Sequence, residues 1–237
     1  LHLVSDTFSF QPGQWIDFRV PPYKWTGGFS PASLDRELPR LSIAVKHSSH
    51  APPSQWVHSD ESAEIGRHVQ VRAGGNCVLD KQNLWQQPVV FCAGGIGISP
   101  LLSMYRQWTE LQRDLAQSKP CATGPAASFL YSVSTQEELV FGEEIVQQAS
   151  LTAQSSTSHN VIFATTQQEA WYDEARRHWE SQGVQCRVGR CMHEFLQSAD
   201  PASAFYICGP PQMLDEGVDL LKKRGVEESN LHFERWW

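Results

Sequence analysis

One twenty-residue stretch, 89–108, constrains the fold of this chain more than any other. It begins with a short apolar run, Val89–Ala93, that is typical of a buried strand. Three glycines then interrupt the run, and an amphipathic helical pattern follows, with Ser99 as its expected N-cap and Pro100 at its first position. The glycines allow the backbone to approach a ligand closely, and a helix N-terminus favours an anion such as a pyrophosphate. An ordinary strand–turn–helix corner would have the same pattern.

Composition and charge restrict the class of protein. With 237 residues, of which 41% are hydrophobic and 19% charged, the chain is long enough for one large domain or two small ones. The formal net charge of −7, without a block of Lys or Arg, argues against a general nucleic-acid binder. Six cysteines form no C-x-x-C pair and no zinc or iron–sulfur spacing, which favours reduced thiols in an intracellular compartment.

Two further patterns concern targeting. The uncharged run Gln86–Tyr105 is long enough to span a bilayer, but its glycines, prolines and change of period indicate that it is not a membrane span. The chain opens at Leu1 within an apparent strand and has no signal peptide, so we expect that the native N-terminus has been removed.

The chain divides into two parts with different periodicity, for which we predict domains at 1–86 and 87–237. The first part contains short alternating runs separated by turns, such as Gln14–Val20, Leu41–Lys46 and His68–Arg72. Few stretches there would form a helix of ordinary length. We therefore expect an antiparallel barrel or sandwich, truncated at its N-terminus.

The second part alternates between strand and helix patterns, which predicts an α/β domain with a mainly parallel sheet and helices on both faces. The expected strands are Val89–Ala93, Ser128–Ser132, Val161–Ala164, Gln185–Val188, Phe205–Cys208 and Leu231–Glu234. The expected helices are Leu101–Gln117, Glu137–Ala149, Glu169–Gln182, Met192–Gln197 and Met213–Arg224. Ligands on such sheets bind beyond the carboxyl ends of the strands, where the glycine-rich turn lies.

Two motifs in the second part carry a resemblance to a known family. Ala93–Pro100 reads Ala-Gly-Gly-Ile-Gly-Ile-Ser-Pro and resembles the A-G-G-x-G-[IV]-[ST]-P signature of the ferredoxin–NADP⁺ reductase superfamily. Cys208–Met213 reads Cys-Gly-Pro-Pro-Gln-Met and resembles its second signature, C-G-P-x-x-M. Tyr131–Leu139 is similar to the family's second strand and following helix, and 232–237 to its terminal strand and closing aromatic residue. The resemblance covers essentially the whole chain, most firmly 88–237.

The resemblance implies a flavin-reductase-type β-barrel followed by a nucleotide-binding domain that takes NAD(P)H. It implies that the first motif contacts the pyrophosphate and that the second borders the nicotinamide. The residues expected to bind the dinucleotide are Gly94, Gly95, Ile96, Gly97, Ile98, Ser99, Pro100, Cys208, Gly209, Pro210 and Met213. Cys208 has an alternative as a buried strand cysteine, the usual environment of that residue type.

The sequence also bears on the choice between NADH and NADPH. In the resembled family an arginine near the end of the second strand often binds the 2′-phosphate of NADP. Ser134 stands at the matching place, and 132–139 contains no cation, so we expect NAD(H) to be preferred over NADP(H). Arg187 or Arg190 could fold back to serve, although a surface position explains either more simply. The G-x-G-x-x-G fingerprint and an acidic residue at the end of the second strand are missing.

The flavin motifs are altered, so the resemblance implies FAD binding less firmly. The family's R-x-Y-[ST] motif corresponds to Gly27-Gly28-Phe29-Ser30, which lacks the phosphate-binding arginine and has Phe in place of Tyr. Phe29 could stack on the isoalloxazine ring, and Ser30 could hydrogen-bond near its N5. Lys46 follows in the matching strand pattern. Phe29 could instead belong to the core, and Lys46 to a solvated face.

The third flavin segment of the family, G-x-x-S, corresponds to Ala51-Pro52-Pro53-Ser54, which keeps Ser54 but not the glycine. Three cations could replace the lost charge: Arg19, Lys24 and Arg36. Loss of a charged phosphate contact would weaken binding roughly tenfold to a hundredfold.

We therefore expect a flavin-dependent NAD(P)H oxidoreductase with Ser30, Cys208 and Trp237 at the reaction site. The resemblance suggests that Trp236 or Trp237 covers the flavin ring where nicotinamide must dock. The main alternative is a non-catalytic NAD(H)-binding sensor or scaffold that has lost flavin. A third is a reductase module for a separate electron-acceptor protein. The similarity is greatest to a mitochondrial-type branch of the superfamily, which implies a mitochondrial location.

Overall fold

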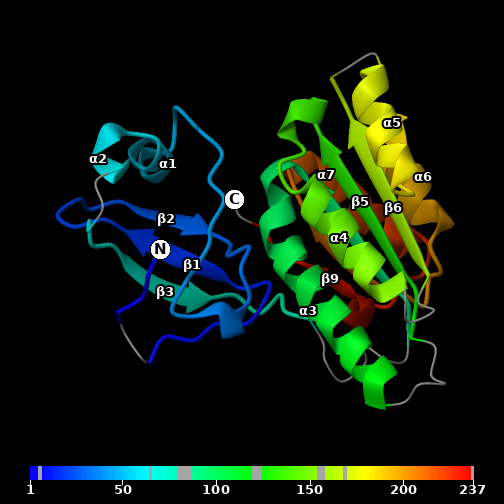
Figure 1. Ribbon diagram of the computed structural model, residues 1–237, viewed down its shortest axis with the longest axis horizontal. Helices are drawn as coiled ribbons and strands as arrows, with labels where there is room; N and C mark the ends of the chain where they lie inside the picture. Colours follow the sequence, from blue (N-terminus) through cyan, green and yellow to red (C-terminus); the bar gives the residue numbers. More distant parts are fainter. Residues whose placement is uncertain are drawn as a thin grey trace.

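The computed structural model describes residues 1–4, 7–63, 66–79, 87–118, 124–153, 158–167 and 170–235. Figure 1 shows two bodies side by side, one built on an antiparallel sheet and the other on a parallel sheet covered by helices. The predicted combination of an antiparallel and an α/β domain is therefore confirmed. The predicted boundary at 86 and 87 falls at the end of the segment 80–86, which lies outside the described residues.

The first domain contains a three-stranded antiparallel sheet in the order β2-β1-β3. Its strands are β1 (Trp15–Arg19), β2 (Thr26–Phe29) and β3 (Gln70–Gly74). Short helical segments follow at η1 (Asp35–Glu37), α1 (Pro52–Val57) and α2 (Asp60–Ala63). A small core of Phe10, Ile16 and Leu41 lies under the sheet.

One predicted strand of the first domain is absent from the described structure, and one observed strand was not predicted. The predicted strand Leu41–Lys46 makes only an isolated bridge, between Ile43 and Pro31, among the described residues. One reason is that the Ser33 side chain, rather than a backbone carbonyl, accepts the Ser42 N–H at 3.0 Å. Strand β2 was not predicted, because two of its four residues are glycines, which have low strand propensity.

The second domain is a six-stranded parallel sheet in the order β7-β6-β5-β4-β8-β9. Its strands are β4 (Val89–Gly94), β5 (Ala127–Val133), β6 (His159–Thr165), β7 (Gln185–Val188), β8 (Ala204–Cys208) and β9 (Leu231–Phe233). Every strand that the sequence predicts here is present. The order reverses at β4, which pairs with β5 on one side and β8 on the other, so the turn after β4 lies at a topological switch point.

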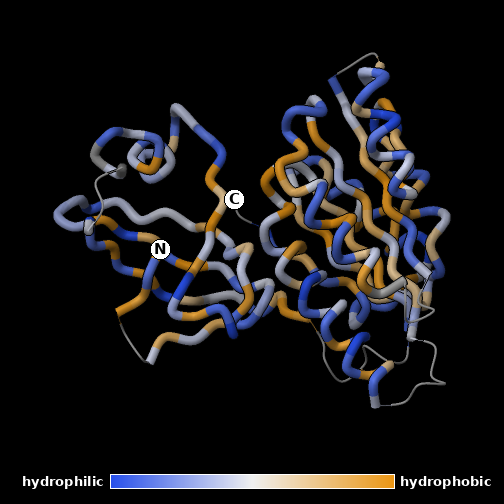
Figure 2. Tube along the Cα trace, viewed as in Figure 1, coloured by the Kyte–Doolittle hydropathy of each residue, from blue (hydrophilic) through white to orange (hydrophobic). Residues whose placement is uncertain are grey.

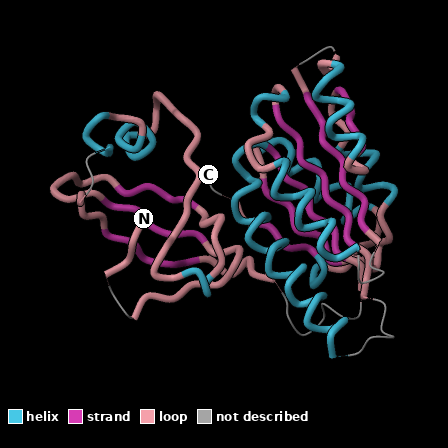
Figure 3. Tube along the Cα trace, in the orientation of Figure 1, coloured by secondary structure: helices cyan, strands magenta, loops and turns pink. Residues whose placement is uncertain are grey.

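Helices cover both faces of this sheet, as predicted (Figure 3). The helical segments are η2 (Gly95–Gly97), α3 (Ile98–Ser118), η3 (Gln136–Glu138), α4 (Gly142–Ala153), α5 (Asp173–Ser181), α6 (Met192–Ser198), α7 (Pro211–Lys223) and η4 (Glu228–Asn230). The first core cluster joins one sheet face to α3, α4 and α5, and the second joins the opposite face to α6 and α7. Hydrophobic segments accordingly run through the strands in Figure 2.

The central strand β4 shows why the sheet is buried on both sides. Phe91 belongs to the first core cluster and its neighbour Cys92 to the second, because successive side chains point to opposite faces. The Phe91 ring stacks between Phe129 and Tyr206 of the neighbouring strands, at 5.5 Å in each case. No described helix is both long and apolar enough to cross a membrane.

Candidate functional site

A cavity of about 540 Å³ opens between the two domains, at the carboxyl ends of β4 and β8. Both predicted motif sets contribute to its lining. The first domain supplies Phe29, Ser30, Lys46 and Ser54, and the second supplies Gly94, Gly95, Ile96, Gly97, Ser99, Pro100, Cys208, Gly209 and Pro210. The structure therefore brings together most of the residues that the sequence singled out.

The two signature motifs meet backbone to backbone at the floor of this cavity. A side-chain carbon at Gly97 would collide with the Cys208 carbonyl, so only glycine fits there. Gly95 has a φ of +52° and faces open space, which leaves its backbone accessible to a ligand. This close approach fixes the glycine-rich turn 94–97 and the Cys-Gly-Pro turn 208–210 relative to each other.

Ser99 is not the N-cap that the sequence predicts. The 3₁₀ turn η2 runs directly into α3, which begins at Ile98, so Ser99 lies within the helix. Its Oγ is buried and has no hydrogen-bond partner among the described residues, although Ser99 lines the cavity. A buried hydroxyl without a partner is costly. An anionic oxygen at the helix N-terminus would satisfy it, so the residues present fit the diphosphate of a dinucleotide.

Two predicted dinucleotide residues lie away from this cavity. Ile98 is fully buried and packs in the first core cluster, because the early start of α3 turns its side chain inward. Met213 lies beneath Gly94 and Gly209 and lines an adjoining cavity instead. Both residues support the turns rather than the main cavity.

Cys208, which lies at the rim of the first core cluster, has a second cysteine near it. Cys77 is mostly buried, and burial, with smaller contributions from Glu234 and Cys208, raises the pKa of its thiol to about 12. Cys77 is therefore a neutral thiol at physiological pH. Glu234, which follows β9, accepts the Asn76 N–H at 3.1 Å and so ties the end of the parallel sheet to the first domain.

The adjoining cavity, of about 260 Å³, lies beyond the carboxyl ends of β5 and β6. It shares Lys46, Gly94, Gly95 and Pro210 with the main cavity, so the two lie side by side. Its further lining residues include Ser132, Ser134, Glu138, Thr166, Arg190, Gln212 and Glu216. Arg187, the other arginine considered from the sequence, instead pairs with Glu194 at 3.5 Å.

Glu138 is a site residue that the sequence analysis missed. No acidic residue stands at the end of β5, but the turn η3 brings Glu138 back to the cavity, where its Oε2 accepts the Ser134 N–H at 3.3 Å. The predicted helix Glu137–Ala149 is thus confirmed only from Gly142 onward, because Leu139 leaves the helical conformation between η3 and α4. A Glu several residues after a predicted strand is a weak signal, which explains the omission.

Lys46 spans the two domains. Its Nζ donates to Glu138 Oε1 at 3.0 Å, and its side chain lines both cavities. From the sequence, Lys46 was interpreted as a flavin contact or as a solvated strand residue. This interdomain ion pair was not predicted.

In the first-domain lining of the cavity, the residues expected near a flavin ring are in place, whereas the one expected near its phosphates is not available. Phe29 and Ser30 line the cavity, and the Phe29 ring is held edge-on against Phe18 at 5.4 Å between centroids. Ser54, by contrast, is buried and uses its hydroxyl locally: it accepts the Ser48 N–H at 2.9 Å and donates to the Lys46 carbonyl at 2.8 Å. The residues present therefore fit the flavin ring but not its phosphates.

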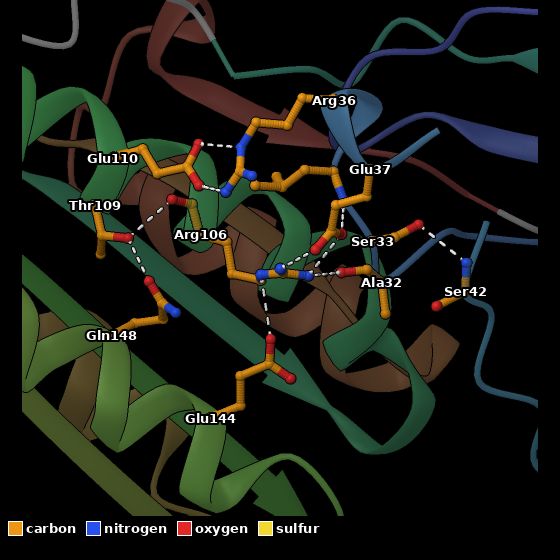
Figure 4. A network of polar contacts seen from close by, with 11 residues as sticks. Ala32, Ser33, Arg36, Glu37, Ser42, Arg106, Thr109, Glu110, Glu144 and Gln148 are labelled. Carbon is orange, nitrogen blue, oxygen red and sulfur yellow. Dashed lines mark hydrogen bonds and ion pairs between the residues drawn. The ribbon is translucent and has the colours of Figure 1, made fainter. Parts of the chain in front are cut away.

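The remaining residues considered for the flavin are two tryptophans and three cations. Trp236 and Trp237 lie outside the described residues. None of the three proposed replacement cations, Arg19, Lys24 and Arg36, appears among the described lining of the cavity. Arg36 instead pairs with Glu110 on α3 (Figure 4).

Helix α3 also fixes the first domain in place through Arg106 (Figure 4). The Arg106 guanidinium donates to the Ala32 carbonyl at 3.2 Å and to Glu37 Oε1 at 2.6 Å, and it pairs with Glu144 of α4 at 3.2 Å. Ala32 lies two residues beyond Ser30, so one side chain connects the flavin-side segment to the helix that begins at the glycine turn. The described residues include no group of three or more His, Cys, Asp or Glu side chains placed to hold a metal ion.

Comparisons with known proteins agree with this geometry. A model of the family described as Oxidoreductase NAD-binding domain matches residues 91–218. Oxidoreductase NAD-binding domain-containing protein 1 of Bos taurus is 34% identical over 241 residues, which cover 99% of this chain and 74% of the relative.

Two solved structures share the fold. The crystal structure of an Amycolatopsis cytochrome P450 reductase has a TM-score of 0.70 at 18% identity, covering 99% of this chain and 63% of that one. A Malassezia yamatoensis flavohemoglobin with bound FAD and heme has a TM-score of 0.69 at 15% identity, covering 98% and 54%. This chain thus spans less than two thirds of either structure. Because the family model matches more than half of the chain and the bovine relative nearly all of it, the chain belongs to the oxidoreductase NAD-binding domain family.

Proposed function

We propose that this chain is an NADH-dependent flavin oxidoreductase that passes electrons on to a separate acceptor. The observation that carries the proposal is the single cavity lined by Phe29 and Ser30 from one domain and by the two signature turns from the other. A nicotinamide ring and a flavin ring held there would lie against each other, and holding two reactants in contact is a large part of catalysis. FAD in the flavohemoglobin of the same fold supports the choice of cofactor.

The dinucleotide would extend across both cavities. The nicotinamide would lie beside Cys208–Pro210, the diphosphate on the turn 95–99, and the adenosine in the smaller cavity. Ser99 would donate its unpaired hydroxyl to a diphosphate oxygen. Lys46, which lines both cavities, provides a positive charge between them.

Flavin, when bound, supplies the hydride acceptor of the reaction. The residues of this chain bind and orient the two rings and exclude water. Phe29 offers an aromatic face, Ser30 a hydroxyl, and Cys208 a half-buried surface at the end of β8. No group in this set needs to be ionised for the transfer.

The proposed preference for NADH rests on the charges of the smaller cavity. Glu138 and Glu216 face it, and a carboxylate there can accept hydrogen bonds from ribose hydroxyls while it repels a 2′-phosphate. Arg190, which also lines the cavity, carries a positive charge that would favour a 2′-phosphate. Because Lys46 is already paired with Glu138, it is not an uncommitted cation for a 2′-phosphate, and we expect NADH to be preferred.

An anaerobic titration of the full chain, loaded with FAD, tests this proposal. NADH should bleach the flavin absorbance near 450 nm at lower concentration than NADPH does. A flavin spectrum that neither nucleotide bleaches would contradict hydride transfer.

One observation favours the alternative of a dinucleotide-binding protein without flavin. Pro53 occupies the space beside Gly27, where the resembled family has its phosphate-binding arginine. That alternative predicts a protein that binds NADH, measured by calorimetry, but binds no flavin at any concentration. Saturable flavin binding would exclude it.

A further inference from the structure

Within the first-domain lining of the cavity, the part expected to hold the flavin phosphates differs from the part expected to hold the flavin ring. A side-chain carbon at Gly27 would lie 2.6 Å from Cβ and 2.8 Å from Cγ of Pro53, which is buried in α1. The proline ring is rigid, so it cannot move aside as a long side chain would. No arginine can therefore occupy position 27, and α1 stands in the space that its side chain would need.

Helix α1 is itself a poor phosphate site. It has only six residues, and the first two, Pro52 and Pro53, have no N–H to donate. The hydroxyl of Ser54, the one residue retained from the G-x-x-S segment, is already donating and accepting hydrogen bonds. The first turn thus lacks both the backbone donors and the free side chain that a phosphate requires.

The charges of the cavity lead to the same conclusion. Lys46 is the one Lys or Arg among its described lining residues, and its Nζ is 3.0 Å from Glu138 on the dinucleotide side. A flavin phosphate would therefore meet no uncommitted cation in the described lining. Recognition of phosphate in proteins depends on such charge-assisted contacts.

The ring end, in contrast, keeps a complete binding surface. Phe29, which also packs against the core of the first domain, lines the cavity beside Ser30, and Ala44 and Val45 line it as well. An aromatic side chain fixed by an edge-on neighbour is a suitable stacking platform for a planar ring. The cavity volume, about 540 Å³, is within the range of small-molecule sites.

We propose that this chain recognises flavin through its isoalloxazine ring and not through its phosphates, so that flavin is an exchangeable ligand and riboflavin, FMN and FAD are equivalent. The proposal rests on the proposed function, because it concerns the flavin of that same site. It identifies the ligand class as a free flavin, with or without phosphate groups on its ribityl chain.

Equilibrium titrations of the flavin-free full chain with riboflavin, FMN and FAD, followed by flavin fluorescence, test the proposal. The three dissociation constants should agree within about threefold and change little between low and high salt. Binding of FAD or FMN more than about thirtyfold tighter than riboflavin would overturn it, because a phosphate contact contributes at least tenfold.

Two variants sharpen this comparison. Phe29→Ala should weaken all three flavins by a similar factor, about tenfold or more, because it removes the stacking surface they share. Gly27→Arg combined with Pro53→Gly adds the cation and removes both proline carbons that block it, and it should favour FMN and FAD over riboflavin by about tenfold. Pro53→Gly alone is the matched control and should leave the three constants equal. A preference for FAD in this control would contradict the proposal.

The outcomes separate this inference from the proposed function. Equal binding of the three flavins without bleaching by NADH would support the inference and overturn hydride transfer. Strong selection for FAD with bleaching would overturn the inference and support the function. Absence of binding by any flavin would overturn both.

Discussion

At the scale of single residues, Ser99 has two roles that can be separated by experiment. Its buried Oγ lacks a partner in the described structure, so Ser99→Ala should keep or slightly raise the melting temperature. The same change should weaken NADH binding by about threefold to tenfold, since the hydroxyl would donate to the diphosphate. Calorimetric titration and thermal unfolding measure the two effects.

Ser103 provides the matched control one turn further along α3. Its Oγ accepts the buried Gly13 N–H at 3.2 Å and donates to the Pro100 carbonyl at 2.9 Å. Ser103→Ala should therefore lower stability by about 1 kcal/mol and leave NADH affinity unchanged. If Ser99→Ala behaves like Ser103→Ala, the hydroxyl of Ser99 does not face the diphosphate.

Glu138 is the residue on which the nucleotide preference depends. Glu138→Gln removes the negative charge but keeps the shape, so the ratio of NADPH to NADH affinity should rise by about tenfold. Glu137→Gln, beside it in η3 but not in the lining of the smaller cavity, should leave the ratio unchanged. The ratio of dissociation constants from parallel titrations is the measurement, and no change in Glu138→Gln would contradict the assignment.

At the scale of elements, strong periodic patterns were predictable and short or irregular segments were not. All six strands of the parallel sheet were predicted: β4, β5, β6 and β8 are largely buried apolar runs, and the more exposed β7 and β9 follow predicted helices. Strand β2, with two glycines, and helix α1, with two prolines, were missed because their composition opposes their structure. The N-cap assigned to Ser99 failed for a related reason: the glycines form a 3₁₀ turn that extends the helix backward.

The packing of α3 on β6 makes stability depend on pH. His159, at the start of β6, contacts Tyr105 and Trp108 of α3, and its Nδ1 lies 2.9 Å from the Tyr105 hydroxyl. Burial lowers the pKa of His159 from 6.5 to about 4. The folded state therefore binds the proton less tightly than the unfolded state, so stability is complete above pH 6.5 and falls as the pH decreases toward 4.

Urea unfolding between pH 7 and pH 4 measures this dependence. His159→Gln, which cannot acquire the charge, should show a shallower fall in unfolding free energy than the native chain over that interval. His193→Gln, an exposed position on α6, should retain the native slope. Equal slopes in all three proteins would mean that the environment of His159 does not set the pH dependence.

At the scale of the whole molecule, the sequence predicted two domains but not how they meet. The contacts between them join residues distant in sequence, and they include Arg106 with Glu37, Arg36 with Glu110 and Lys46 with Glu138. Such pairs have no local sequence pattern, because a charged residue that contacts the other domain cannot be distinguished in the sequence from one that faces solvent. The cavity between the domains, and with it the meeting of the two motif sets, depends on these contacts.

Arg106 is the side chain through which this arrangement can be tested. Arg106→Gln removes the bond to the Ala32 carbonyl and leaves Glu37 and Glu144 without their shared cation, so it should cost about 1–3 kcal/mol of stability. The segment 29–44 should then exchange its amide hydrogens faster, and NADH should bleach bound flavin at least tenfold more slowly.

The exposed pair of Arg36 with Glu110 is the control, since it joins the same two domains without touching Ala32. Arg36→Gln should change stability by less than about 1 kcal/mol and leave both exchange and bleaching as in the native chain. NAD⁺ should bind to all three proteins with similar affinity, because the glycine turn lies within the second domain alone. If Arg106→Gln lost stability but bleached flavin at the native rate, the cavity would hold the two rings without help from this contact.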